Sequence, residues 1–284
     1  MTNGIILGFF DGIHVGHREL INRALKFLPN SDITVLTFKT SPSLYFNGTE
    51  EYIRTRKDSV SIIKNMGVNA EELDFGSIAN TSAEKYLREV AEKYRPNAIF
   101  TGFNHTFGYN KSGNPEYLQK HEETYGYKYI CVPPVKTDNT IISSTLIKQL
   151  LKDGNIKKAN ELLLEPFSVS GNVIKGSQIG RTIGFPTANI KYPEKIVHIP
   201  FGVYGVNISI DSKAYKGIMN WGRKPTLNNI LEPIAEIHIL NFDRDIYNLE
   251  IKADIINHIR SEKKFSSLEE LKNQIEKDIQ CLKL

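Results

Sequence analysis

The sequence predicts an α/β chain with two modules, a doubly wound parallel sheet followed by a small antiparallel β-barrel that ends in a helix. From residue 1 to about 164, short apolar runs alternate with stretches of helical periodicity, which is the pattern of parallel α/β units. From about Phe167, glycine and proline separate a succession of β-rich runs, which is typical of antiparallel sheets. A length of 284 residues accommodates two domains of ordinary size.

The first module reads as alternating strands and helices. We expect its strands at Gly4–Phe10, Ile33–Phe38, Glu72–Phe75, Ala98–Thr101 and Tyr127–Val132. We expect its helices at His17–Phe27, Asp58–Met66, Ser82–Tyr94 and Pro115–Tyr125. Thr81 and Glu84 have the spacing of a capping box at the start of the third helix. The alternation predicts a parallel sheet with helices on both faces.

The second module is read from β-rich runs and one final helix. We expect its strands at Phe167–Ile174, Gly202–Ile210, Ala214–Met219, Ala235–Leu240 and Tyr247–Ile256. The final helix starts at Ser267, which forms a second capping box with Glu270. Its apolar stripe is interpreted as a docking face and consists of Leu268, Leu271, Ile275, Ile279 and Leu282.

Two helical segments, Ser144–Leu151 and Ile156–Leu164, precede the join between the modules. The join is placed within Lys157–Glu165, where the pattern changes from helical to β-rich. The expected domains are therefore residues 1–164 and 165–284.

Composition restricts the partners of the chain. The formal charge of +4 suits binding of small anions, and the lysines are spread out rather than gathered into an arm for nucleic acid. The two cysteines, Cys131 and Cys281, indicate neither a disulfide framework nor a zinc site. The apolar stretch Gly4–Phe10 is too short for a signal peptide or a membrane span. We expect a soluble cytoplasmic protein, monomeric or weakly homo-oligomeric, that binds small molecules and neither nucleic acid nor membrane.

The stretch from Gly8 to His17, GFFDGIHVGH, follows an apolar strand and enters a helix. Its glycines let the backbone approach a ligand closely, and the start of a helix offers unpaired N–H groups to phosphate. His14 and His17, three residues apart, can face one polyphosphate. The competing interpretation is a pair of structural histidines in a tight turn.

This stretch resembles the adenylyltransferase module of the prokaryotic bifunctional riboflavin kinase and FMN adenylyltransferase (FAD synthetase) family, and more broadly the Rossmann-like HxGH nucleotidyltransferases. Three further segments match that family in order: Thr37–Phe38, Gly102–Gly108 with Gly113, and Ile142–Lys148. The last resembles the Ser-Ser-Thr-x-Ile-Arg signature of the family, which on its own would be a plain helix N-cap. Hydroxyls at a helix start, and a cation one turn later, suit phosphate binding.

The resemblance implies that this module converts FMN and ATP to FAD and pyrophosphate, with Mg²⁺ bridging the phosphates. It assigns catalytic roles to His14, His17 and Lys148. It assigns ATP binding to Gly8, Phe10, Asp11, Gly16, Asn104, Ser144 and Thr145. Phe38 and Phe107 would wall the flavin ring, although both could equally be core aromatics.

The second glycine-rich stretch, from Gly171 to Asn189, ends in Gly-Phe-Pro-Thr-Ala-Asn. The Thr187 hydroxyl and the Asn189 carbonyl suit a hard cation such as Mg²⁺. A surface hairpin with turn glycines is the alternative.

This second stretch is very similar to the riboflavin kinase signature. The segments Gly202–Tyr204, Asn220–Thr226, Glu236–Leu240, Asp245–Tyr247 and Arg260 with Phe265 follow in the order of that family. The resemblance implies phosphorylation of riboflavin by ATP to FMN, with Glu236 as catalytic base, Gly176 and Arg181 at ATP, and Thr187 and Asn189 at the metal. From the residues alone, Glu236 would be a solvent-facing strand residue, because it alternates with Ile237.

The sequence departs from the family pattern at four places, one of them a pair of residues. Lys148 stands where arginine is usual, His105 replaces an aromatic, Leu164–Glu165 replaces Gly-Arg, and Asn248 replaces a glycine. Two alternatives therefore stand beside a bifunctional enzyme: a chain with only one active module, and a flavin-binding sensor without catalysis. An unrelated HxGH enzyme would lack the kinase signature.

Overall fold

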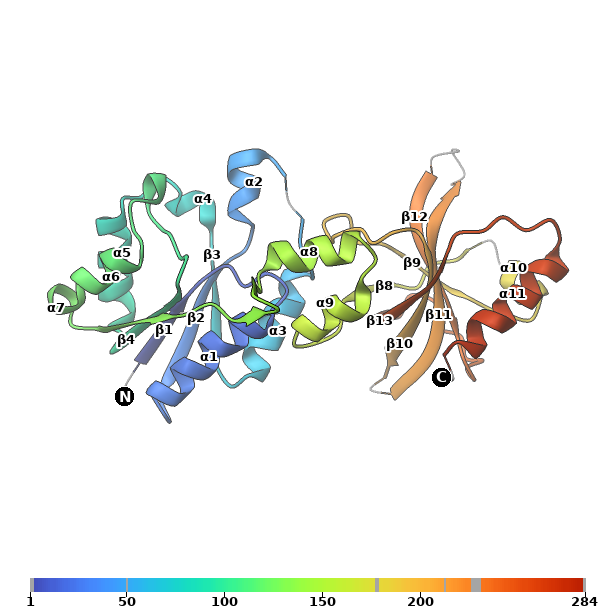
Figure 1. The fold of residues 1–284 in the computed structure, drawn as a ribbon, viewed down its shortest axis with the longest axis horizontal. Helices are drawn as coiled ribbons and strands as arrows, with labels where there is room; N and C mark the ends of the chain where they lie inside the picture. Colours follow the sequence, from blue (N-terminus) through green and yellow to red (C-terminus); the bar gives the residue numbers. More distant parts are fainter. Residues whose placement is uncertain (1–2, 50, 177–178, 212, 226–230, 283–284) are drawn as a thin grey trace. The chain divides into compact units, whose positions relative to one another are not determined.

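The computed structural model describes residues 3–49, 51–176, 179–211, 213–225 and 231–282 (Figure 1). Ser177, Gln178 and Thr226 of the two signature stretches lie outside these residues. The chain forms two compact units, Met1–Ser144 and Thr145–Leu284. This division falls earlier than the expected join at residues 164 and 165, and the limits of the two functional domains stay a proposal.

The first unit contains a five-stranded parallel sheet with the order β3-β2-β1-β4-β5. Its strands are β1 (Asn3–Leu7), β2 (Asp32–Phe38), β3 (Asn69–Leu73), β4 (Ala98–Gly102) and β5 (Lys128–Val132). Its helices are α1 (Val15–Phe27), α2 (Pro42–Asn47), α3 (Arg56–Asn65), α4 (Phe75–Ile78), α5 (Ala83–Tyr94), α6 (Pro115–Lys120) and α7 (Glu122–Tyr125). A short 3₁₀ turn (Tyr109–Lys111) and the two-residue strands β6 (Lys136–Thr137) and β7 (Thr140–Ile141) complete the unit. The doubly wound parallel sheet expected from the sequence is confirmed.

Alternation along β1 explains why helices cover this sheet. Ile5 and Leu7 are buried in one cluster with Leu87 and Val90 of α5, while Ile6, between them, is fully buried as well. Successive strand residues face opposite sides, so both faces of the sheet are apolar and need cover. Helix α1 packs on β1, β4 and β5, and Figure 1 shows helices lying along the sheet.

Several expected boundaries in this unit are wrong. β1 ends at Leu7 rather than Phe10, because Phe10 has φ of 59° and leaves the extended conformation. The helix expected at Pro115–Tyr125 is broken at His121 into α6 and α7. The N-cap of α5 is Ser82, whose side chain accepts a hydrogen bond from the Lys85 amide, and not Thr81. β3 starts three residues and ends two residues earlier than expected, since Asp74 already caps α4.

The second unit contains a six-stranded sheet with the order β8-β13-β10-β11-β12-β9 and antiparallel neighbours throughout. Its strands are β8 (Ser168–Asn172), β9 (Ala188–Lys191), β10 (Gly202–Ile210), β11 (Lys213–Pro225), β12 (Leu231–Ile239) and β13 (Glu250–Ser261). Its helices are α8 (Ser144–Lys152), α9 (Ile156–Leu162), α10 (Ile179–Thr182) and α11 (Leu268–Gln280). The Ile174 amide donates to the Asn189 carbonyl at 2.8 Å, which links the two ends of the sheet into a nearly closed barrel.

The barrel interior is apolar, as Trp221, Tyr204 and Ile237 are fully buried. α9 joins this unit through Asn160, whose amide nitrogen donates to the Ile255 carbonyl at 2.9 Å. The terminal helix begins at the expected cap, with Ser267 accepting from the Glu270 amide at 3.1 Å. The Glu270 carboxylate binds Ser266 rather than Ser267, so the expected capping box is only half formed. None of the helices in the described ranges is both long and apolar enough to cross a lipid bilayer.

Candidate active sites

The turn that follows β1 has a strained backbone, and residues from a later segment of the chain stabilise it. Phe10, Gly12 and Ile13 have φ of 59°, 81° and 47°, a region that non-glycine residues rarely adopt. The buried Asp11 carboxylate accepts a hydrogen bond from the Ile53 amide at 2.9 Å. Such backbone strain persists only where the surroundings fix it.

Two arginines bind the carbonyls of this turn. Arg54, only 1% exposed, donates from Nε to the Gly12 carbonyl at 3.1 Å. Arg56 donates to the Phe9 carbonyl at 3.1 Å and to the Thr37 hydroxyl at 2.9 Å, and it forms an ion pair with Glu72. The two guanidinium groups therefore hold the turn at both of its ends.

The turn presents two stacked imidazoles. The ring centroids of His14 and His17 are 3.7 Å apart, with planes 19° from parallel. His14 caps α1, and its Nδ1 accepts from the Gly16 amide at 3.1 Å and the His17 amide at 3.4 Å. The Nδ1 of His17 accepts from the His14 amide at 3.4 Å. Because both Nδ1 atoms accept, the hydrogen of each neutral ring is on Nε2.

Burial keeps both rings neutral. It lowers the pKa of His14 to about 4. Burial above all, with smaller electrostatic contributions from the neighbouring His14 ring and Arg56 guanidinium, lowers the pKa of His17 well below its usual value. At neutral pH the pair therefore offers two N–H donors without charge.

Five ATP-binding candidates of this unit lie on or beside the turn. Ser144 donates from its hydroxyl to the Asp11 carbonyl at 2.9 Å. Phe10 is buried with its ring 4.7 Å from that of His17. A Cβ on Gly8 would lie 2.8 Å from the Phe10 ring, and one on Gly16 would lie 3.0 Å from the His14 ring. The structure therefore brings Gly8, Phe10, Asp11, Gly16 and Ser144 together with the histidines.

Other sequence candidates are placed elsewhere. Asn104 lies in the loop after β4. Thr145 and Lys148 follow Ser144 along α8 in the second compact unit, and their role at the triphosphate stays a prediction.

An aromatic cavity of about 690 Å³ lies in the first unit. Phe38 and Phe107 both line it, together with Phe46 and Phe75. The rings of Phe38 and Phe75 meet edge to face at 5.2 Å. A Cβ on Gly113 would lie 2.4 Å from the Phe107 ring, so this position needs glycine for Phe107 to occupy its place. The two aromatics are walls of a cavity and not only core residues.

The sequence reading missed the helix that carries Phe46. α2 begins after Ser41, which caps it, with Pro42 at its first position. That Ser-Pro pair is a helix-start signal and could have found it.

His105 also lines this cavity, where the related family has an aromatic. Its ring stacks on Phe107 at 5.9 Å. Its Nε2 is shielded from solvent and has no hydrogen-bond partner within the described part of the chain. Burial lowers the pKa of His105 to about 4, so the ring is neutral at pH 7.

Two cavities of about 320 and 330 Å³ lie in the second unit, and Thr187 lines both. Arg181 and the segment Phe242–Tyr247 line the first cavity. Glu236 and Arg260 line the second. The two cavities therefore adjoin at Thr187.

Asn189 is buried beside Thr187 and opposite Glu236 in the β9–β12 register. A Cβ on Gly176 would lie 2.5 Å from the Asn189 amide nitrogen, so the glycine chain passes directly over this side chain. The structure thus places Gly176 against Asn189, and Asn189 next to Thr187 along the chain and opposite Glu236, while Thr187 and Glu236 line the cavities.

Comparison with known proteins agrees with this two-site arrangement. The family model described as FAD synthetase matches residues 2–146, and that described as riboflavin kinase matches residues 163–283. The bifunctional riboflavin kinase/FMN adenylyltransferase of Buchnera aphidicola subsp. Schizaphis graminum is 34% identical over 99% of this chain and 93% of its own length. The protein of the same name from Bacillus subtilis is 31% identical over 96% of this chain and 89% of its own.

The chain belongs to the bifunctional riboflavin kinase/FMN adenylyltransferase family. A crystal structure named macrolide-efflux protein from Streptococcus pneumoniae has the same fold, with a TM-score of 0.89 at 32% identity. It covers 98% of this chain and 93% of its own.

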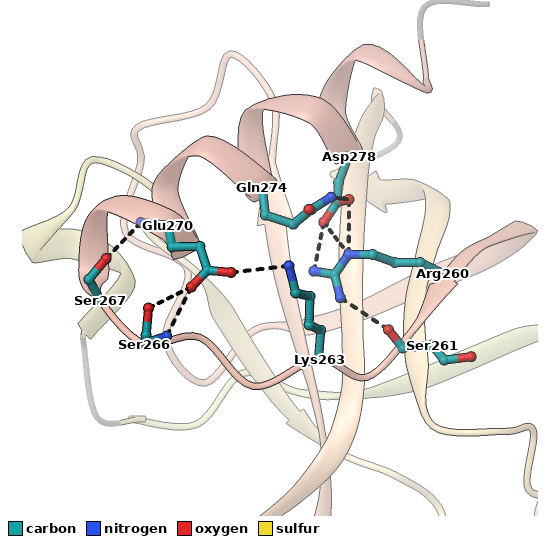
Figure 2. A network of polar contacts seen from close by, with 8 residues as sticks. All are labelled: Arg260, Ser261, Lys263, Ser266, Ser267, Glu270, Gln274 and Asp278. Carbon is teal, nitrogen blue, oxygen red and sulfur yellow. Dashed lines mark hydrogen bonds and ion pairs between the residues drawn. The ribbon is translucent and has the colours of Figure 1, made fainter.

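In this family member, a polar network ties α11 to the end of β13 and to the segment between them (Figure 2). The sequence reading matched Arg260 to the family pattern but did not identify its partner. The carboxylate of Asp278 in α11, 2% exposed, accepts a bifurcated hydrogen bond from Arg260 Nε, with both oxygens at 3.0 Å, and another hydrogen bond from Nη2 at 2.8 Å. Lys263 pairs with Glu270 at 3.1 Å. The apolar stripe of α11, expected to be a docking face, packs inward only in part. Leu271 and Ile275 line the cavity, whereas Leu268 is 58% exposed.

Proposed function

We propose that this chain makes both flavin nucleotides, with riboflavin phosphorylated in the second unit and FMN adenylated in the first. Flavin nucleotide biosynthesis is the activity of the family to which both halves of the chain belong. The observation that carries the two-step proposal is the presence of two separate, chemically different sites, the histidine pair of the first unit and the twin cavities of the second. The substrates are ATP, riboflavin and FMN, and the products are FMN, ADP, FAD and pyrophosphate.

For adenylyl transfer, the FMN phosphate attacks the α-phosphorus of ATP and pyrophosphate leaves. The neutral His14 and His17 donate from Nε2 to the phosphate oxygens on which charge develops. Arg54 and Arg56 bind the carbonyls of the turn and thereby keep the two imidazole rings in place. Lys148, with Ser144 and Thr145, takes the leaving pyrophosphate, and the Phe38–Phe107 cavity takes the flavin ring.

For the kinase step, the two cavities give each substrate its own place. ATP occupies the cavity that Arg181 lines, with Gly176 beside it, and riboflavin occupies the cavity that Glu236 lines. Glu236 accepts the proton of the 5′-hydroxyl as that oxygen attacks the γ-phosphorus. Because Thr187 lines both cavities, the phosphoryl group passes beside it.

Mg²⁺ fits the donor atoms at the junction of these cavities. The Thr187 hydroxyl and the buried Asn189 amide oxygen are hard oxygen donors, and the backbone of Gly176 lies so close to Asn189 that it leaves no room for a side chain there. Among the described residues no group of three His, Cys, Asp or Glu side chains could hold a metal, so phosphate oxygens and water would complete the shell. The ion would neutralise charge on the phosphates during transfer.

We further propose a cytoplasmic protein, monomeric or weakly homo-oligomeric, without a nucleic-acid partner. The spread-out lysines and the net charge of +4 support this.

The decisive experiment is chromatographic product analysis of the purified protein with ATP and Mg²⁺. One sample receives riboflavin and the other receives FMN. Conversion of riboflavin to FMN and then FAD supports two active sites. Conversion of only one substrate identifies a single active module, and binding without conversion identifies a flavin sensor.

A further inference from the structure

Backbone pairing between β9 and β12 begins at Ala188, so Thr187, the residue before it, lies outside the ladder. In the β9–β12 ladder, Asn189 pairs with Glu236 and Ala188 with Ile237. The preceding residue along the chain is Thr187, and Pro186 before it has no N–H group to donate. The Pro186 carbonyl can still accept a hydrogen bond.

His238 of β12 supplies that hydrogen bond from a side chain. Its Nδ1 lies 2.9 Å from the Pro186 carbonyl oxygen. A carbonyl oxygen only accepts, so Nδ1 carries the hydrogen and donates it. The Phe185 ring meets the His238 ring edge to face at 5.3 Å, and the Phe185 amide donates to the Gly180 carbonyl at 2.7 Å.

These contacts place Thr187 between two fixed points. On one side, Ala188 is held by the β9–β12 ladder, and on the other, Pro186 is held by His238. Before Phe185, Gly184 has φ of 89°, which marks a sharp turn at the start of the segment. Without the His238 bond, the segment from Gly184 to Thr187 would lose its connection to β12 ahead of Ala188.

We infer that His238 is a positioning residue for phosphoryl transfer, which holds the Pro186 carbonyl through Nδ1 and so fixes Thr187 at the junction of the two cavities. The inference rests on the kinase step proposed above. His238 lies two residues after Glu236 on β12, so the two side chains share one face of the strand.

Asparagine and glutamine substitutions separate this role from direct contact with a substrate. Asparagine places an amide N–H close to the position of Nδ1, whereas glutamine places one close to Nε2. We expect His238→Asn to keep the rate of riboflavin phosphorylation within about threefold, and His238→Ala and His238→Gln to lower kcat by about 10- to 100-fold.

Adenylation of supplied FMN by the same protein samples is the control for folding, because that step uses the first unit. If His238→Ala phosphorylates riboflavin at the wild-type rate, the inference is wrong. It is equally wrong if glutamine rescues and asparagine does not, since His238 would then act through Nε2.

Hydrogen exchange measured by mass spectrometry tests the bond without turnover. The peptide that spans Gly184–Ala188 should exchange faster in His238→Ala than in wild type, with His238→Asn close to wild type. Unchanged exchange in His238→Ala would overturn the inference. A wild-type protein that forms no FMN would instead contradict the proposed kinase step, and the exchange result would still decide the role of His238.

Discussion

Arg260 and Asp278 form an ion pair, in which Nε and Nη2 both donate to the carboxylate, that ties the end of β13 to the terminal helix α11 (Figure 2). Asp278 is 2% exposed and also accepts from the Gln274 amide at 2.9 Å. Both charged residues line the cavity that contains Glu236. The pair therefore stabilises one wall of the proposed riboflavin site.

Replacing Arg260 by methionine should leave a buried carboxylate without its partner. We expect a loss of about 3–5 kcal/mol in unfolding free energy, and a higher KM for riboflavin as α11 loosens. Urea unfolding and kinase assays measure the two effects. Arg260→Met combined with Asp278→Leu should recover much of the lost stability, because no charge remains buried.

The matched control for stability is an exposed ion pair in the same unit. Arg244 and Asp211 lie 2.6 Å apart but are 54% and 63% exposed. Arg244→Met should cost less than about 1 kcal/mol, since solvent screens the pair. Equal losses in the two arginine variants would contradict the role given to burial.

The two sites should fail independently. His14→Ala should lower FAD formation from FMN by about 100-fold or more and leave FMN formation from riboflavin unchanged, because it removes a donor to the transferring phosphate. Glu236→Ala should do the reverse, because the riboflavin hydroxyl loses its base. Product analysis with each substrate separates the steps. Parallel loss of both steps in either variant would rule out two separate sites.

The strained turn before His14 should depend on Arg54. Arg54→Met removes the donor to the Gly12 carbonyl, so the left-handed residues Gly12 and Ile13 lose a constraint. We expect kcat for FMN adenylation to fall by about 10- to 100-fold, because the imidazoles are misplaced, with riboflavin phosphorylation unaffected. Arg88 of α5, an exposed arginine, is the control, and Arg88→Met should change neither step. Full adenylation activity in Arg54→Met would show that the turn keeps its conformation without Arg54.

The sequence predicted the modules better than their edges. Hydrophobic periodicity gave the parallel sheet, because β1 and its neighbours bury both faces. It failed where one residue changes the backbone, as at Phe10, whose left-handed φ ends β1 early. Glu236 could not be assigned from alternation alone, because facing a cavity and facing solvent give the same pattern.

Contacts between residues that are distant in sequence could not be predicted either. The contact between Arg54 and Gly12 and the pair formed by Arg260 and Asp278 depend on tertiary packing. Periodicity and local signals contain no information about which buried charge meets which acceptor. The role of His238 likewise follows only from the carbonyl that it meets, that of Pro186.

His105→Phe should stabilise the first unit, and more so as pH falls. The wild-type ring buries an Nε2 without a hydrogen-bond partner among the described residues, and removing it should add about 1 kcal/mol at pH 7. Burial lowers the pKa of His105 to about 4 in the folded chain, against 6.5 when it is exposed. Between these values the unfolded chain binds the proton and the folded chain does not, so wild-type stability falls as pH drops from 6.5 towards 4.

Phenylalanine has no such titration, so the difference in unfolding free energy between variant and wild type should widen between pH 7 and pH 4. Urea unfolding at several pH values measures it. His14 and His17, whose pKa values burial also lowers, are present in both proteins and cancel in the difference. A constant difference across this range would mean that His105 is protonated as easily in the folded chain as in the unfolded one. The Phe107 side of the cavity would then be open to water rather than closed around the ring.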